Sequence, residues 1–215
     1  MERIFAIGDI HGCFDKLEKL MGIIPLEYGN DRLVFIGDYI DRGPRSRDVV
    51  DFVIDIRKRF EKVTCLLGNH ESMLLQYLDR PGSETRSLYF LNGGDATATS
   101  YGYCEPPEED MIDIPTEHLD FFRSLLPFYE TPDYIFVHAG LRPGVPLCEQ
   151  NLDDLVWIRH EFIYSDFDFG KTVVFGHTPF SSPLIEGNKI GIDTGAVYGG
   201  SLTCVELPSK TIYEV

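Results

Sequence analysis

Long apolar runs and positive charge are both scarce in this chain of 215 residues. No apolar stretch approaches the ~20 residues that a membrane-spanning helix needs, and the chain does not open on the charged, apolar and small-residue succession of a secretion signal. The 19 Lys and Arg residues face 35 Asp and Glu residues, so the formal net charge is −16. A field of that sign repels nucleic acid and anionic membrane surfaces. We therefore expect a cytoplasmic protein that binds neither nucleic acid nor membranes.

Paired cysteines are also missing from the sequence. The five cysteines are odd in number, widely scattered and without a paired spacing. This usage is typical of reduced intracellular thiols, and it argues against a disulfide framework or a sulfur-rich structural zinc site. None of these thiols is predicted to be a metal ligand.

Five short apolar runs each end on side chains that can bind metal ions. In each run, β-branched or aromatic residues give way to Asp, His or Asn, often directly after Gly, so the polar groups lie where strands end. Open α/β sheets bind their ligands at this edge. One such run could be a common turn, but five in one chain predict a dinuclear metal centre. The runs are FAIGDIHG, LVFIGDYIDRG, CLLGNHE, IFVHAG and VVFGHT.

The candidate ligands offer carboxylate, amide and imidazole groups but no thiolate. Such a set suits manganese, iron or zinc, and a carboxylate can bridge two ions. Two ions about 3.5–4 Å apart can hold a phosphoryl group and lower the pKa of water, so that hydroxide is available near neutral pH. We choose Asp38 as the bridge. The candidate ligands are Asp9, His11, Asp38, Asn69, His138 and His177.

The motifs at the ends of these runs are GDIHG at 8–12, GDYIDRG at 37–43, GNHE at 68–71, HAG at 138–140 and GHT at 176–178. In order and spacing they resemble the signature of the phosphoprotein phosphatase family within the calcineurin-like metallophosphoesterases. The resemblance covers the chain from about residue 3 to the C-terminus and is closest to the compact bacterial and phage-type serine/threonine protein phosphatases. It implies that one ion is held by Asp9, His11 and Asp38, and the other by Asp38, Asn69, His138 and His177.

The resemblance also implies the catalytic groups. His70 resembles the general acid of the family, oriented by Asp41, and Arg42 resembles one phosphate clamp. The run LVWIR at 155–159 is similar to a stretch of the phage-type members, which makes Arg159 the candidate for a second clamp. Positive charge for the phosphate and an acid for the leaving group are what such a reaction needs besides the ions.

Each candidate ligand also has a structural interpretation. Asp9 and Asp38 could be turn or capping residues. His138 and His177 could be hydrogen-bonded histidines at the ends of buried strands, and Asn69 could be a turn residue.

The remaining candidates have alternatives of the same kind. Asp41 and Arg42 could form a structural ion pair in a tight turn, and Arg159 could be a surface arginine. Tyr198, in a Gly-rich turn, is a further candidate for substrate contact. His118 carries no motif, and we expect it to be solvated on a helix.

The scaffold is predicted to be an α/β fold in which two mixed β-sheets pack together with helices outside. Apolar residues repeat at helical spacing over about 14–24 and 49–60, before a strand at 63–67. This alternation implies parallel strands with right-handed crossovers. Residues 1–215 are expected to form a single catalytic domain. In the second half, strands are expected near 134–138, 172–176, 189–193, 201–207 and 211–214.

Residues 80–115 are the least regular stretch and are predicted to form loops around short helices. Two interpretations stay open for it: a solvated connection, or a cap on the substrate side of the site. For the acidic run at 105–110 itself, we expect a solvated connection.

Three functions are compatible with these residues. The first is a phosphomonoesterase that acts on phosphoserine, phosphothreonine or phosphotyrosine in proteins. The second is a hydrolase of dinucleoside polyphosphates such as diadenosine tetraphosphate; Asp41 favours the first, because bacterial symmetrical tetraphosphate hydrolases usually replace that residue. The third, a non-catalytic scaffold, is disfavoured because no ligand is missing. The expected partner is thus a phosphorylated protein or a small phosphoester.

The reaction is predicted to be a direct in-line attack on phosphorus. No Cys is followed by Arg at the sixth position, so the thiolate loop of tyrosine phosphatases is absent. No Asp-x-Asp leads a strand-to-loop junction, and Asp166-Phe-Asp168 is interpreted as a turn. A phosphoenzyme is therefore not expected.

Overall fold

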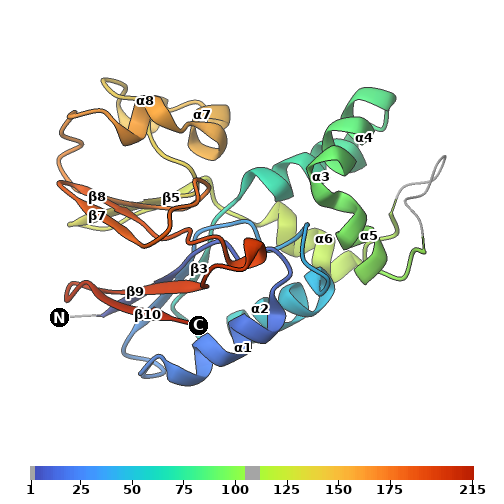
Figure 1. Cartoon of the computed structure of the whole chain (residues 1–215), viewed down its shortest axis with the longest axis horizontal. Helices are drawn as coiled ribbons and strands as arrows, with labels where there is room; N and C mark the ends of the chain where they lie inside the picture. The colour runs from blue at the N-terminus through green and yellow to red at the C-terminus, as the bar shows by residue number, and fades with distance from the viewer. Residues whose placement is uncertain (1–2, 105–111) are drawn as a thin grey trace.

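Two five-stranded β-sheets pack face to face between helices in the computed structural model of the chain, which describes residues 3–104 and 112–215 (Figure 1). The predicted architecture, two packed mixed sheets flanked by helices, is confirmed. None of the helices in these described ranges is long and apolar enough to cross a membrane.

The first sheet has the strand order β10-β9-β1-β2-β3. Strands β1, β2 and β3 are parallel, whereas β9 and β10 form an antiparallel hairpin beside β1. Helices α1 and α2 supply the crossovers between the parallel strands, as the alternating pattern predicts. The strands are β1 (Ile4–Ile7), β2 (Arg32–Phe35), β3 (Val63–Cys65), β9 (Thr203–Leu207) and β10 (Thr211–Glu214).

The second sheet has the order β4-β5-β6-β8-β7 and is also mixed. Strands β5, β6 and β8 are parallel, and β4 and β7 pair antiparallel at the two edges. The sequence did not predict these two edge strands, because each has only three residues and is partly exposed. The strands are β4 (Phe128–Glu130), β5 (Tyr134–Val137), β6 (Thr172–Phe175), β7 (Leu184–Glu186) and β8 (Lys189–Gly191).

Alternate residues of each central strand face different parts of the core. In β1, Ile4 and Ala6 pack between the sheets, whereas Phe5 and Ile7 pack beneath the helices. Side chains of the other sheet, among them Phe136 and Val174, complete the layer between the sheets. This two-residue period is what a strand covered on both faces requires.

The helices cover the outer faces of the sheets and one end of the molecule. Figure 1 shows α1 and α2 beneath the first sheet, α7 and α8 over the second, and α3 to α6 together at one end. The helices are α1 (Phe14–Ile23), α2 (Ser46–Arg59), α3 (Asn69–Asp79), α4 (Ser83–Tyr89), α5 (Asp95–Ser100), α6 (Thr116–Arg123), α7 (Leu152–Trp157) and α8 (His160–Ile163). Three short turns of helix are η1 (Phe90–Gly94), η2 (Leu147–Glu149) and η3 (Ala196–Tyr198).

The irregular segment after α3 has the predicted character over residues 80–104. Helices α4 and α5 are short and are joined through η1, where Gly93 has a φ of 100°. The acidic run at 105–110 lies outside the described residues.

One expectation about a histidine is wrong. His118 lies on helix α6 as predicted, but it is buried. Its Nε2 lies 2.9 Å from Asp51 Oδ1, and its Nδ1 lies 2.7 Å from the Tyr101 hydroxyl. Both ring nitrogens have partners, which is why this polar side chain can be buried.

Candidate active site

The predicted site residues come together at the carboxyl ends of the parallel strands. Asp9 and His11 follow β1, and Asp38 follows β2. Asn69 begins α3 directly after β3, and the last two candidate ligands, His138 and His177, follow β5 and β6. Strands from both sheets therefore deliver these side chains to one place. All six candidate ligands are buried, with no side chain of the set more than 5% exposed.

Asp38 lies between two groups of potential ligand atoms. One group consists of Asp38, His11 and His70, and the other of Asp38, His138 and His177; within each group the ligand atoms lie within 4.8 Å of one another. Asp38 Oδ2 is 3.3 Å from His11 Nε2, and its Oδ1 is 3.4 Å from His138 Nε2. Each carboxylate oxygen thus faces a different group, as a bridging ligand would require.

Asp9 and Asn69 border these groups. Asn69 Oδ1 lies 3.0 Å from His138 Nε2 and 2.9 Å from His177 Nδ1. Asp9 is in neither group, but its Oδ2 accepts a hydrogen bond from the backbone N–H of His177 at 2.9 Å. The structure therefore places both residues in contact with the predicted ligands.

The electrostatics of the site favour a charged imidazole at His138, beside the Asp38 carboxylate, and neutral imidazoles at His11 and His177. Burial lowers the pKa of His11 to about 3. Burial, and then the charge of His138, lowers the pKa of His177 to about 2. For His138, burial acts in the same sense but the Asp38 carboxylate outweighs it, and the pKa rises to about 10. Neutral imidazoles such as His11 and His177 keep a lone pair for a cation.

The residues present fit divalent cations. Asp9 Oδ1 and His177 Nε2 are buried and have no hydrogen-bond partner within the described residues. Burial and the charge of the nearby buried Asp193 raise the pKa of Asp9 well above its ordinary value. Buried carboxylates that lie close together need positive charge between them, and this donor set of oxygen and imidazole nitrogen suits manganese, iron or zinc.

Backbone strain is concentrated at the site. Within residues 3–104 and 112–215, six non-glycine residues have a positive φ. Five of them are predicted site residues, and such conformations persist only where the surrounding structure enforces them. The five are His11, Asp38, Asp41, Arg42 and His177, with φ values of 45°, 52°, 71°, 67° and 61°.

Two glycines of the motifs allow close approach to the carboxylates. A Cβ atom at Gly68 would collide with Asp38 Oδ1, and one at Gly176 would collide with Asp9 Oδ1. Glycine before the polar residue is therefore a steric requirement at these two motifs.

Glu71 organises the loops but was not singled out from the sequence. Its buried carboxylate accepts four backbone N–H bonds, at 2.8–3.2 Å, from Gly68 and from residues 38–40. Glu71 stands at the third position of α3, where a capping-box glutamate reaches back to the helix start. That position in GNHE was the available signal. The bonds to the loop after β2 could not be predicted, because they depend on how β2 and β3 pair.

His70 and Asp41 form a buried pair beside the candidate ligands. His70 Nδ1 lies 2.7 Å from Asp41 Oδ2, and His70 Nε2 is buried without a hydrogen-bond partner in the described part of the chain. Burial opposes charge on His70, but the carboxylates of Asp38 and Asp41 outweigh it and raise its pKa. An imidazole that is held at one nitrogen and has no partner at the other can carry a proton to a substrate.

The two predicted clamps differ in their surroundings. Arg42 is half-buried; its Nη1 lies 2.9 Å from His11 Nε2, and its guanidinium carbon lies 5.6 Å from the ring centroid of exposed Tyr198. Arg159 is exposed between α7 and α8, and its charge is one of the causes of the lowered pKa of His177. Both arginines therefore lie near the candidate ligands.

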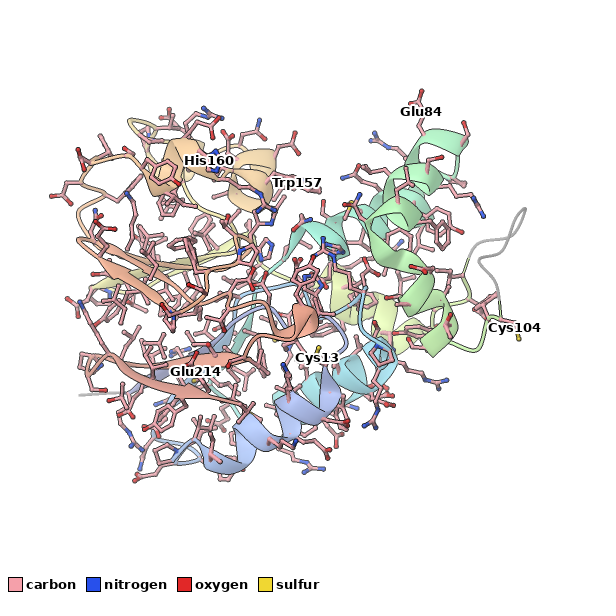
Figure 2. All side chains as sticks on the ribbon, in the orientation of Figure 1. Cys13, Glu84, Cys104, Trp157, His160 and Glu214 are labelled. Carbon is pink, nitrogen blue, oxygen red and sulfur yellow. The ribbon has the colours of Figure 1, made fainter. Side chains whose placement is uncertain are left out.

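Trp157 adds an aromatic ring that the sequence did not assign to the site. It projects from the end of α7 toward the side on which α3 and α4 lie (Figure 2). Its ring is 5.7 Å from the ring of His177, at an interplanar angle of 87°.

Comparisons with known proteins agree with this geometry. The model of the calcineurin-like phosphoesterase family matches residues 2–204. The asymmetrical bis(5'-nucleosyl)-tetraphosphatase PrpE of Geobacillus sp. (strain WCH70) is 31% identical, over 96% of this chain and 91% of its own. Serine/threonine-protein phosphatase 1 of Salmonella typhimurium is 29% identical, over 95% of this chain and 91% of its own.

A solved structure matches over the whole chain. It is the crystal structure of a protein provisionally identified as a diadenosine tetraphosphatase. The match has a TM-score of 0.76 and 26% identity, and it covers 100% of this chain and 93% of that one.

Proposed function

The chain belongs to the calcineurin-like phosphoesterase family and is a hydrolase, and from this premise we propose a dinuclear phosphoesterase that uses two divalent cations. Manganese, iron and zinc suit the donors. When bound, the cations would supply positive charge and an activated water molecule. We propose that Asp9, His11 and Asp38 hold one cation, and that Asp38, Asn69, His138 and His177 hold the other.

The observation that carries the mechanism is the buried His70–Asp41 pair beside His11 and Asp38, in which Nδ1 is bound to the carboxylate and Nε2 has no hydrogen-bond partner among the described residues. His70 donates the Nε2 proton to the leaving oxygen as its bond to phosphorus breaks. The resulting neutral imidazole keeps the proton on Nδ1, where Asp41 holds it. Arg42 and Arg159 bind the phosphoryl oxygens, because a guanidinium group can contact two oxygens at once.

The geometry supports a phosphomonoester in a protein as the first candidate substrate. A serine or threonine alkoxide is a very poor leaving group and needs a proton as it departs. The His70–Asp41 pair supplies that proton from a position held at 2.7 Å. A phosphorylated tyrosine would need the proton less.

The names of the relatives support a second candidate substrate, a dinucleoside polyphosphate, at least as strongly. The relative from Geobacillus carries the name of a bis(5'-nucleosyl)-tetraphosphatase and matches along nearly the whole chain. In this case the bond broken is a phosphoanhydride, and the leaving group is a nucleotide phosphate that departs with less help from an acid.

Turnover of the two substrates by the same sample separates the candidates. A phosphoserine peptide and diadenosine tetraphosphate should be compared with the metal content measured in parallel. A kcat/KM for the peptide that matches or exceeds that for the dinucleotide supports the protein phosphatase. Turnover of the dinucleotide alone assigns the second function.

Replacement of His70 tests the acid independently of the substrate class. His70→Asn should cost roughly 10²–10⁴-fold in kcat/KM on a phosphoserine peptide or phenyl phosphate, the range typical of general acid catalysis. The loss should be distinctly smaller on p-nitrophenyl phosphate, whose leaving group departs without a proton. Both variant and wild type should bind the same amount of metal. Equal losses on all substrates would assign His70 to phosphate binding instead.

A further inference from the structure

Two hydroxyl groups bind the oxygen of the Asp41 carboxylate that His70 does not contact. The Tyr89 hydroxyl donates to Asp41 Oδ1 at 2.9 Å, and Thr97 Oγ1 donates to the same oxygen at 2.6 Å. Asp41, Tyr89 and Thr97 are all 0% exposed. The two oxygens of this carboxylate therefore have different partners: Oδ1 accepts from the two hydroxyl groups, and Oδ2 contacts His70.

Their surroundings require the hydroxyl groups of Tyr89 and Thr97 to act as hydrogen-bond donors to Asp41. Burial and the neighbouring Asp41 charge raise the pKa of Tyr89 well above its ordinary value, so the phenol keeps its proton. The Asp41 backbone N–H donates to Thr97 Oγ1 at 2.9 Å, and Ser46 Oγ lies 3.0 Å from that oxygen. Because an ionised carboxylate can only accept and a hydroxyl has a single proton, the Thr97 proton goes to Asp41.

Both donors come from the segment that the sequence left as either a connection or a cap. Tyr89 ends α4 and Thr97 lies in α5, on either side of η1. The Tyr89 ring stacks on Tyr77 at a centroid distance of 5.5 Å and an interplanar angle of 14°. A Cβ atom at Gly94 would lie 2.6 Å from a Tyr89 ring carbon. Glycine at this position therefore leaves room for the ring to pack against the backbone between the helices.

We propose that Tyr89 and Thr97 are positioning residues for the proposed reaction: they hold the Asp41 carboxylate so that it orients His70 toward the leaving oxygen. The proposal rests on the role of His70 as the proton donor. A buried carboxylate oxygen that loses a donor is left unsatisfied, and the carboxylate can then turn away from His70. Helices α4 and α5 thus contribute side chains that support the active site.

The test uses two aryl phosphates that differ in their need for a proton. Tyr89→Phe and Thr97→Val each remove one donor with little change of shape. Each should lower kcat/KM on phenyl phosphate about 10-fold and on p-nitrophenyl phosphate less than about 3-fold, the loss expected of one buried hydrogen bond to a charged group. Thr97→Ser, which keeps the hydroxyl, should recover most of what Thr97→Val loses.

A matched control comes from the same segment. Tyr101→Phe removes a phenol hydrogen bond to the buried His118, whereas the hydroxyl donors to Asp41 in the described part of the chain are Tyr89 and Thr97. This variant should be less stable than wild type while the ratio of kcat/KM for the two aryl phosphates stays the same. A change of that ratio in the control would show that general loosening of the segment causes the effect, and would overturn the proposal.

A second readout does not depend on activity. The proton on His70 Nδ1 should give a low-field ¹H NMR resonance, assigned by its absence in His70→Asn. Tyr89→Phe and Thr97→Val should each shift this resonance, and Tyr101→Phe should leave it in place. An unshifted resonance in both variants, with equal losses on the two aryl phosphates, would reduce Tyr89 and Thr97 to structural residues.

The outcomes also separate this proposal from the one on which it rests. If His70→Asn discriminates between the aryl phosphates and the two hydroxyl variants do not, only the positioning role is wrong. If His70→Asn does not discriminate either, the assignment of the acid fails as well. In an Asp41→Asn background, Tyr89→Phe should cost nothing further, because residues that act through one group are not additive.

Discussion

Arg42 and Arg159 are the two guanidinium groups assigned to the phosphate. Arg42→Ala and Arg159→Ala should each lower kcat/KM and weaken inhibition by inorganic phosphate about 10- to 100-fold, the range for lost hydrogen bonds to a charged group. Both effects are expected because one bidentate contact serves the bound anion and the transition state alike. The measurement is the inhibition constant of phosphate in each variant.

Arg142→Ala provides the control, since this exposed arginine is paired with Asp154. It should leave phosphate inhibition unchanged. An Arg159 variant that behaves like the control would mean that Arg159 is a surface residue, whereas Arg42 would keep its role.

At the scale of elements, the start of helix α3 joins two loops, the one after β2 and the one after β3. Glu71, in the first turn of α3, accepts backbone N–H groups from Gly68 and from the loop after β2 that carries Asp38. Because four donors converge on one carboxylate, the relative position of Asp38 and Asn69 depends on it.

Glu71→Gln should therefore destabilise the fold by roughly 1–3 kcal/mol, because the amide NH₂ would face backbone donors instead of accepting from them. Metal affinity should fall as well, since two candidate ligands lose their support. Urea unfolding and a metal titration would measure the two effects. Glu84→Gln, on the exposed first turn of α4, is the matched control. If Glu71→Gln bound metal like the control, the loops would be held by other contacts.

The whole molecule carries a net charge of −16, and its buried acidic groups include Asp9, Asp38 and Asp193 at the site. Attraction of a phosphate must therefore be local, through cations and the two arginines. The interpretation of residues 1–215 as one catalytic domain stays a prediction.

Removal of divalent cations should abolish activity, and manganese should restore it. The addition of manganese should also raise the melting temperature, because a ligand that binds only the folded state stabilises that state. At a free ligand concentration of about 100 times Kd, the stabilisation is about 2.7 kcal/mol. Differential scanning calorimetry with and without manganese would measure the rise, and Asp38→Asn should abolish most of it. Undiminished activity in thoroughly chelated protein would exclude the dinuclear proposal.

Most of the scaffold could be predicted because its signals are local. The apolar periods of β1, α1, β2 and α2 are set by neighbours along the chain, and the observed α1, α2 and β3 begin and end within a few residues of the ranges predicted for them. The edge strands β4 and β7 could not be predicted, because their residues are partly buried or exposed and form no apolar run, whereas the equally short β3 and β8 are largely buried.

The sequence by itself determined which polar side chains end the strands, and parallel pairing then had to bring residues such as Asp9, Asp38 and Asn69 to one edge. Only the tertiary structure decided what supports them. Tyr89 and Thr97 stand 48 and 56 residues from Asp41, and His118 stands 67 residues from its partner Asp51. No local pattern specifies such pairs, because a buried hydrogen bond between distant residues depends on the packing of whole helices against the sheet.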